Sequence, residues 1–184
     1  MTRISDIPFD TLTPEQRRIA TEISSARGSS QPRGPFPIWL RAPGLAESAN
    51  RLGNVLRVHG KLDKRLFELA VLLIARHWSA SYEWYAHEDD AFAAGLSPEV
   101  VRAIRVKQFP DFKRDDERLV YEIIAELNDT NKLNQSTYDR AIIKLGLDPL
   151  VELIAVAGFY TMVAMTLNAF DVSVPEGNSR PFDD

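Results

Sequence analysis

Apolar side chains recur along most of the chain at the three- and four-residue spacing of an amphipathic helix. The spacing predicts helices over residues 14–28, 44–59, 64–78, 115–129 and 136–146, with one more ending at Gly95, a short one opening at Pro98 and a long one starting at Asp148-Pro149. No segment alternates for long enough to predict a strand, and VSVP near residue 172 is too short. The predicted fold class is therefore all-α.

Capping residues and helix breakers divide the chain. Thr13-Pro14-Glu15-Gln16 is a capping-type helix start, and Asp63 is a candidate N-cap. The stretch that ends at Gly95 either continues the preceding helix or forms a new helix capped near Ser79 or Ser81. Three prolines and two glycines in GSSQPRGPFP, residues 28–37, exclude a helix there. We expect an N-terminal helix and Pro/Gly-rich connection over residues 1–38, a helical core over 39–174, and a frayed tail over 175–184.

The stretch from Leu150 to Phe170 is almost entirely apolar. It is long enough to cross a bilayer, which needs about 20 residues. It also carries Glu152 and several small or polar residues, and no Lys or Arg flanks it closely. We therefore expect a buried core or subunit-interface helix and no membrane partner.

Composition narrows the functional classes. The 184 residues carry a net charge of −4, and the 22 Lys and Arg form no basic run, so no nucleic-acid partner is expected. The chain has no cysteine, which excludes disulfides, thiolate metal sites and a Cys nucleophile. The N-terminus lacks the apolar region of a secretory signal, so a cytoplasmic location is expected.

One carboxyl group stands out in the strongest predicted helix. In LFELAVLLIA, residues 66–75, Glu68 is the only polar side chain, and a helix that is apolar nearly all round is buried all round. Burial of the carboxyl favours a raised pKa and requires a partner. The partner is either a functional group or, in a purely structural role, a backbone group or an arginine such as Arg65 or Arg76.

Glu83 and His87 lie four residues apart in SYEWYAHEDDA, and therefore on one helix face. Imidazole suits proton transfer near neutral pH, and a neighbouring carboxylate stabilises its cation. The same pair is also consistent with simple helix stabilisation. Helical-bundle di-iron sites need Glu-x-x-His twice, whereas this chain has a single Glu-x-x-x-His, so no metal is expected.

Residues 61–105 resemble the core of the carboxymuconolactone decarboxylase and alkylhydroperoxidase D-like superfamily, and the segments around GPFPIWLRAPGLAE and FYTMVAMTLNAFDVSVPEG resemble the longer decarboxylase members. The peroxidase pattern is a Glu, a Cys-x-x-Cys twelve residues later, and a His four residues after that. Glu68 and His87 match the Glu and the His, while Ala80 and Glu83 occupy the two Cys positions. The resemblance therefore implies an all-α helical bundle without thiol peroxidase chemistry.

What the decarboxylase resemblance implies is a cofactor-free lyase acting on a small carboxylated lactone or related cyclic acid. His87 would be the general acid or base, Glu83 would orient it or share its proton, and Glu68 would be a second acid or its support. Arg57, Arg65 and Arg76 are all candidates for binding a substrate carboxylate, with Arg76 the one placed in the predicted site. Trp39, Trp84 and Tyr160 are candidates for the pocket wall, with packing in the core as the default for each. Members of this superfamily assemble through apolar helices, so the resemblance also implies a homo-oligomer. The alternative to the enzyme is a non-catalytic, oligomeric binding or structural protein of the same fold.

Overall fold

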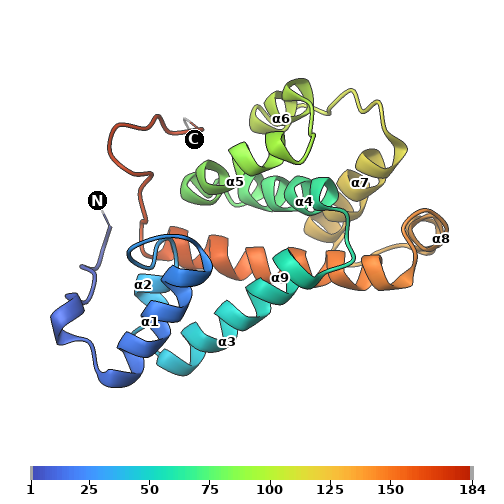
Figure 1. The fold of residues 1–184 in the computed structure, drawn as a ribbon. Helices are drawn as coiled ribbons and strands as arrows, with labels where there is room; N and C mark the ends of the chain where they lie inside the picture. Colours follow the sequence, from blue (N-terminus) through green and yellow to red (C-terminus); the bar gives the residue numbers. More distant parts are fainter. Residues whose placement is uncertain (1, 183–184) are drawn as a thin grey trace.

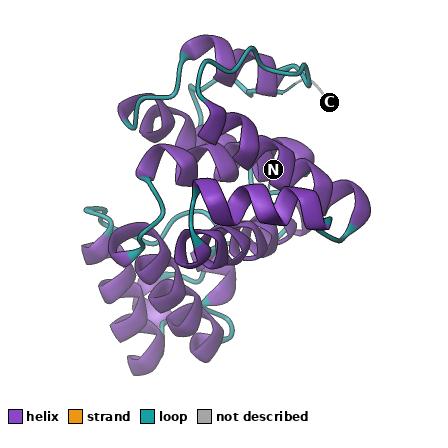
Figure 2. Ribbon diagram, turned by 90° about the vertical axis from the view of Figure 1, so that its right-hand side faces the viewer, coloured by secondary structure: helices purple, strands orange, loops and turns teal. Residues whose placement is uncertain are grey.

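The structure is a computed structural model that describes residues 2–182, within which there are helices and connections but no strand (Figure 2). The predicted all-α fold class is confirmed. The helices are α1 (Pro14–Ala26), α2 (Phe36–Trp39), α3 (Pro43–Asn54), α4 (Lys64–His77), α5 (Ser81–Ala93), α6 (Pro98–Arg105), α7 (Asp115–Thr130), α8 (Gln135–Lys144) and α9 (Leu147–Ala169), with a 3-10 turn, η1 (Phe9–Thr11), and a π-helix, η2 (Val55–His59).

Helix α4 is the centre of the core. Every residue from Arg65 to Arg76 is buried, and the helix packs against α5, α6, α7 and α9. Figure 1 shows α9 crossing the middle of the molecule, with α4 and α5 on one side of it and α1 to α3 on the other. The two long apolar helices therefore hold together two groups of helices, and a site can form where the groups face each other.

Several helix starts follow the predicted capping chemistry. Thr13 and Gln16 form a capping box at the start of α1, and the Asp63 carboxylate accepts from the first amides of α4. The start of α9 differs from the prediction, because the helix begins at Leu147 and its N-cap is Gly146. The Asp148 side chain, within the first turn, forms an ion pair with Lys61 at 2.6 Å.

The connection before α3 contains more helix than expected. Residues 28–37 were predicted to exclude one, but α2 begins at Phe36, because proline is well suited to the first turn of a helix and Pro37 lies in that turn. The single helix expected over residues 44–59 is an α-helix to Asn54 that continues as the π-helix η2. Helix α5 begins at Ser81 without a side-chain cap, so neither predicted serine caps it.

The C-terminal segment is ordered around one aromatic residue. Phe182 is buried, its ring centroid lies 5.2 Å from that of Trp84, and the Arg76 guanidinium lies over it at 4.4 Å. A frayed tail was predicted from Pro175 onward. Phe182 instead packs against Trp84 and Arg76, because burial of an apolar ring is favourable, and residues 183–184 of the predicted tail lie outside the described residues.

Helix α9 combines a buried face with an exposed apolar one. By length and composition it could cross a membrane, and half of its most apolar stretch is buried inside the protein, as in a core helix. Leu153, Val156 and Leu167 are buried, whereas Val151 and Ile154 are 60% and 40% exposed. The helix is therefore both a core element and an uncovered apolar surface.

Candidate functional site

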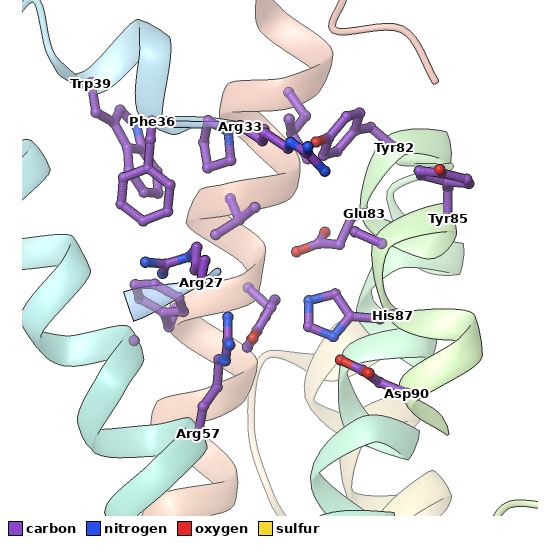
Figure 3. A pocket seen from close by; sticks show the side chains of 18 of the residues that line it. Arg27, Arg33, Phe36, Trp39, Arg57, Tyr82, Glu83, Tyr85, His87 and Asp90 are labelled. Atoms are coloured by element: carbon purple, nitrogen blue, oxygen red, sulfur yellow. The ribbon is translucent and has the colours of Figure 1, made fainter. Parts of the chain in front are cut away.

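A cavity of about 440 Å³ lies between α5 and α9 on one side and the end of α1, α2, α3 and η2 on the other (Figure 3). This volume is within the range of small-molecule sites, about 300–1,000 Å³. Aromatic, cationic and acidic side chains all contribute to its walls. The lining residues are Arg27, Arg33, Gly34, Pro35, Phe36, Trp39, Gly53, Arg57, Tyr82, Glu83, Tyr85, Ala86, His87, Asp89, Asp90, Phe159, Tyr160, Val163 and Leu167.

His87 projects from α5 into this cavity (Figure 3), and Glu68 on α4 is its hydrogen-bond partner. The His87 Nδ1 lies 2.8 Å from the Glu68 Oε2, and Glu68 is 0% exposed. The Lys64 ammonium, one turn earlier on α4, lies 2.5 Å from the other Glu68 oxygen. The prediction that Glu68 is buried is confirmed, but its partners are His87 and Lys64, not Arg65, Arg76 or a backbone group.

The protonation of this pair follows from its surroundings. Burial acts to raise the pKa of Glu68, but the hydrogen bond and charge of His87, together with Lys64, outweigh burial and leave the pKa below its ordinary value. An ionised carboxylate only accepts hydrogen bonds, so Nδ1 of His87 carries a proton and donates it to Glu68. In the neutral imidazole, Nε2 is then the basic nitrogen, and the ring presents it to the cavity.

Glu83 is a second carboxyl group at the cavity, with a different environment. It is 1% exposed, and neither of its oxygens has a hydrogen-bond partner among the described residues. Burial raises its pKa well above the ordinary value. The expected Glu83–His87 pairing is therefore replaced by a Glu68–His87 pair, and Glu83 is a neutral acid beside it.

The raised pKa of Glu83 predicts a specific pH dependence of stability. A carboxyl whose pKa is higher in the folded than in the unfolded protein stabilises the fold below its ordinary value of 4.5, and this contribution is lost as the pH rises through the folded-state pKa. The melting temperature of the native protein should therefore fall relative to that of Glu83→Gln as the pH is raised above 4.5. Parallel melting curves over this range would show that Glu83 is not desolvated.

The wall opposite α5 carries arginines. Arg27 from the end of α1 donates to the Asn50 Oδ1 at 2.6 Å and lies over the Phe36 ring at 4.4 Å. Burial and the charge of Arg57 lower the pKa of Arg27 to about 10. Arg57 itself comes from the π-helix η2, and Arg33 comes from the loop before α2. Sequence reasoning listed Arg57 only as one candidate of three and missed Arg27 and Arg33.

Aromatic side chains from α2 and α9 close the remaining walls. Tyr160 lies edge-on to His87, with ring centroids 5.0 Å apart, and the Trp39 Nε1 donates to the Thr166 Oγ1 at 3.2 Å. Both residues line the cavity, as the predicted site requires. The absence of a Cβ at Gly53 allows close packing on α3, since a methyl group there would lie 3.1 Å from the Phe159 ring.

Two residues of the predicted site do not line the cavity. Trp84 is fully buried between Phe182 and Arg105, because it lies 100° around α5 from Glu83. Arg76 donates to the Arg105 carbonyl and to the Ser79 hydroxyl, on the far side of α4. The third candidate arginine, Arg65, is paired with Asp116 and Glu117. Trp84 and Arg76 are therefore core and tail contacts, and we omit them from the site.

Three possible metal ligands also lie close together at this site. Glu68, His87 and Asp90 each bring one possible ligand atom within 4.8 Å of the other two. The Lys64 ammonium already neutralises Glu68, and Nδ1 of His87 is engaged by the same carboxylate. A hydrogen-bonded acid–base pair accounts for these contacts, and we assign no metal to them.

Comparisons with known proteins identify the fold. No family model and no curated protein matches the chain. A peroxidase-related protein from Silicibacter sp. TM1040 superimposes with a TM-score of 0.76 at 13% identity, over 95% of this chain and 92% of the other. An alkylhydroperoxidase AhpD core protein, described as peroxidase-related, from Ralstonia eutropha JMP134 gives 0.77 at 15% identity, over 95% and 93%. The chain therefore has the AhpD-like helical fold.

Proposed function

We propose that the protein is a cofactor-free acid–base enzyme acting on a small carboxylated lactone or a related cyclic acid. The observation that carries the proposal is the His87–Glu68 pair, in which a buried, ionised carboxylate holds an imidazole whose second nitrogen faces a cavity of ligand size. This is the arrangement of a general base or acid whose tautomer is fixed by its partner. With no cysteine in the chain, thiol peroxidase chemistry does not apply.

The proposed reaction is the loss of CO₂ from a carbon adjacent to a carbonyl. The bond between that carbon and the carboxylate breaks, and its electron pair moves into the carbonyl to give an enolate. The imidazolium of His87 then delivers a proton to the carbon, and water restores the proton to His87. The neutral Glu83 carboxyl is suited to donate a hydrogen bond to the enolate oxygen, since a donor aimed at developing charge in a water-poor site lowers the barrier.

A product assay tests this proposal. The protein is incubated with a panel of carboxylated lactones and cyclic keto acids, and release of CO₂ is measured against a blank without protein. We expect at least one member of the panel to lose its carboxyl group faster than the blank. Release at the blank rate across the panel would contradict the proposed decarboxylation.

The exposed face of α9 favours a second property, self-association. Leu147, Val151, Ile154 and Met165 are exposed along one uncharged side of a single helix. We propose that a second copy of the chain covers this face, because identical uncharged surfaces can pair without burying an unpartnered charge. The non-catalytic alternative, an oligomeric binding or structural protein, rests on the same surface.

A charge placed on that face should disrupt the assembly. Val151→Lys introduces an ammonium group at a position that is 60% exposed in the single chain, so the monomer should fold normally while burial in an interface becomes costly. Sedimentation velocity should show the native protein as an oligomer and the variant as a smaller species. A native protein that sediments as a monomer would contradict the proposal.

A further inference from the structure

We propose that Arg27 and Arg57 form a binding subsite for the oxyanion of a planar acid, and that the carboxylate bound there is an anchor and not the group that reacts. The inference deepens the proposed function and rests on it for the identity of the reacting end. The subsite itself stands on the geometry of the cavity.

The cavity wall formed by Arg27 and Arg57 carries an excess of positive charge. Arg27 and Arg57 line the same cavity and are close enough for the charge of one to lower the pKa of the other. Among residues 2–182, the contacts of Arg27 are the neutral amide of Asn50 and the Phe36 ring, and Arg57 has no ion-pair or hydrogen-bond partner. Two like charges thus face one space without a carboxylate between them, and a bound anion would relieve their repulsion.

Aromatic side chains shape the space beside the two guanidinium groups. The rings of Phe36 and Trp39 are in edge-to-face contact, with centroids 5.3 Å apart, and those of Phe159 and Tyr160 are in the same arrangement at 5.3 Å. All four side chains line the cavity. Aromatic walls of this kind favour a flat, apolar ring over a branched or fully hydrated ligand.

The arginines and the acid–base pair fix the orientation of a bound acid in the cavity. Figure 3 shows Arg27 and Arg57 on the side of the cavity opposite to Glu83 and His87. A carboxylate paired with two guanidinium groups is stabilised as an anion, which would oppose its departure as CO₂. The anchored group is therefore not the one that leaves, and the ligand presents a second functional group, a carbonyl or another carboxyl, to His87.

Binding of benzoate tests the subsite without any reaction. Isothermal titration calorimetry is used with three ligands. Comparing benzoate with neutral benzamide tests the contribution of the charge at the same shape, and comparing benzoate with inorganic phosphate tests whether the subsite prefers a carboxylate to a phosphate. We expect benzoate to bind at least about tenfold more tightly than benzamide, and Arg27→Gln or Arg57→Gln to weaken benzoate by about tenfold or more. Arg51→Gln is the matched control, because Arg51 is an exposed arginine on α3 that does not line the cavity.

A structural role for the arginines predicts a different pattern. If Arg57 only supported the fold, Arg57→Gln would lower the melting temperature, whereas relief of repulsion predicts an unchanged or higher value without ligand. Equal binding of benzoate and benzamide, or equal weakening by Arg51→Gln, would overturn the proposal. Tighter binding of phosphate, lost on the same substitutions, would overturn its assignment to a carboxylate.

The test also separates this subsite from the proposed chemistry. His87→Gln should leave benzoate affinity within about threefold of the native value, because His87 contacts the other end of the ligand. Benzoate binding that requires Arg57 but not His87 supports the subsite even if no decarboxylation is found. If Arg57→Gln still decarboxylates a substrate at the native rate, the acid–base role of His87 stands, and the proposed role of Arg57 as an anchor is wrong.

Discussion

Replacing His87 by Gln is expected to lower the rate of the proposed reaction by about 10²–10⁴-fold, the usual contribution of a general acid or base. Glutamine keeps a polar side chain at the position but cannot carry a proton to carbon. Because His87 is partly exposed and lies at the cavity wall, the substitution should leave the fold nearly unchanged. Steady-state rates and the melting temperature of the same preparation check both parts.

A matched pair of variants separates chemistry from support. Glu68→Gln keeps the shape of the buried side chain but removes the charge that fixes the tautomer of His87, so its rate should fall by less than that of His87→Gln. A large fall in melting temperature in His87→Gln with no loss of rate would identify the pair as a helix-joining contact. The non-catalytic alternative would then be the better description.

Replacing Trp84 by Ala is expected to lower the free energy of unfolding by about 3–5 kcal/mol, the usual cost of removing a fully buried large side chain. Trp84 is 0% exposed and packs against Phe182 and the Arg105 guanidinium. The alanine variant loses these contacts and leaves a void between α5 and the C-terminal segment. Urea unfolding followed by circular dichroism measures the change.

The control for this position is Trp84→Phe. The indole Nε1 has no hydrogen-bond partner among the described residues, so phenylalanine loses part of the packing and no hydrogen bond. It should therefore be destabilised much less than the alanine variant. A Trp84→Ala protein with native stability but lost ligand binding would instead return this residue to the cavity wall, where sequence reasoning had put it.

The contrast between Trp84 and its neighbour Glu83 illustrates what local sequence patterns predict and what they do not. Helical periodicity was sufficient to predict the all-α fold, the Asp63 cap and the burial of Glu68, since these depend on neighbours within one helix. Glu83 and Trp84 share a broad helix face, but adjacent residues point 100° apart. Which of them faces a cavity is decided by the helices packed around α5, and periodicity carries no record of those neighbours.

The same limit applies to the charged residues of the site. Glu68 was correctly singled out because it interrupts an apolar run, but one of its two partners, His87, lies on another helix. Arg27 and Arg57 come from α1 and η2, 30 residues apart in the chain, and converge only through the packing of α1, α3 and α9. Arg76 is also an arginine and lies at the end of the apolar segment that contains Glu68. Its side chain nevertheless packs on the other side of α4, against the Arg105 carbonyl and Phe182. Long-range packing therefore had to be known before the cationic wall could be recognised.

The most direct test is whether His87 moves a proton to or from carbon. The protein is incubated in D₂O with a carboxylated lactone or cyclic keto acid from the panel, and NMR follows the formation of the product at the carbon that had carried the carboxyl group. The native protein is predicted to incorporate deuterium at that carbon, and His87→Gln is predicted to do so no faster than solvent alone. Equal rates of incorporation by both proteins would contradict the assignment of His87 as the proton donor.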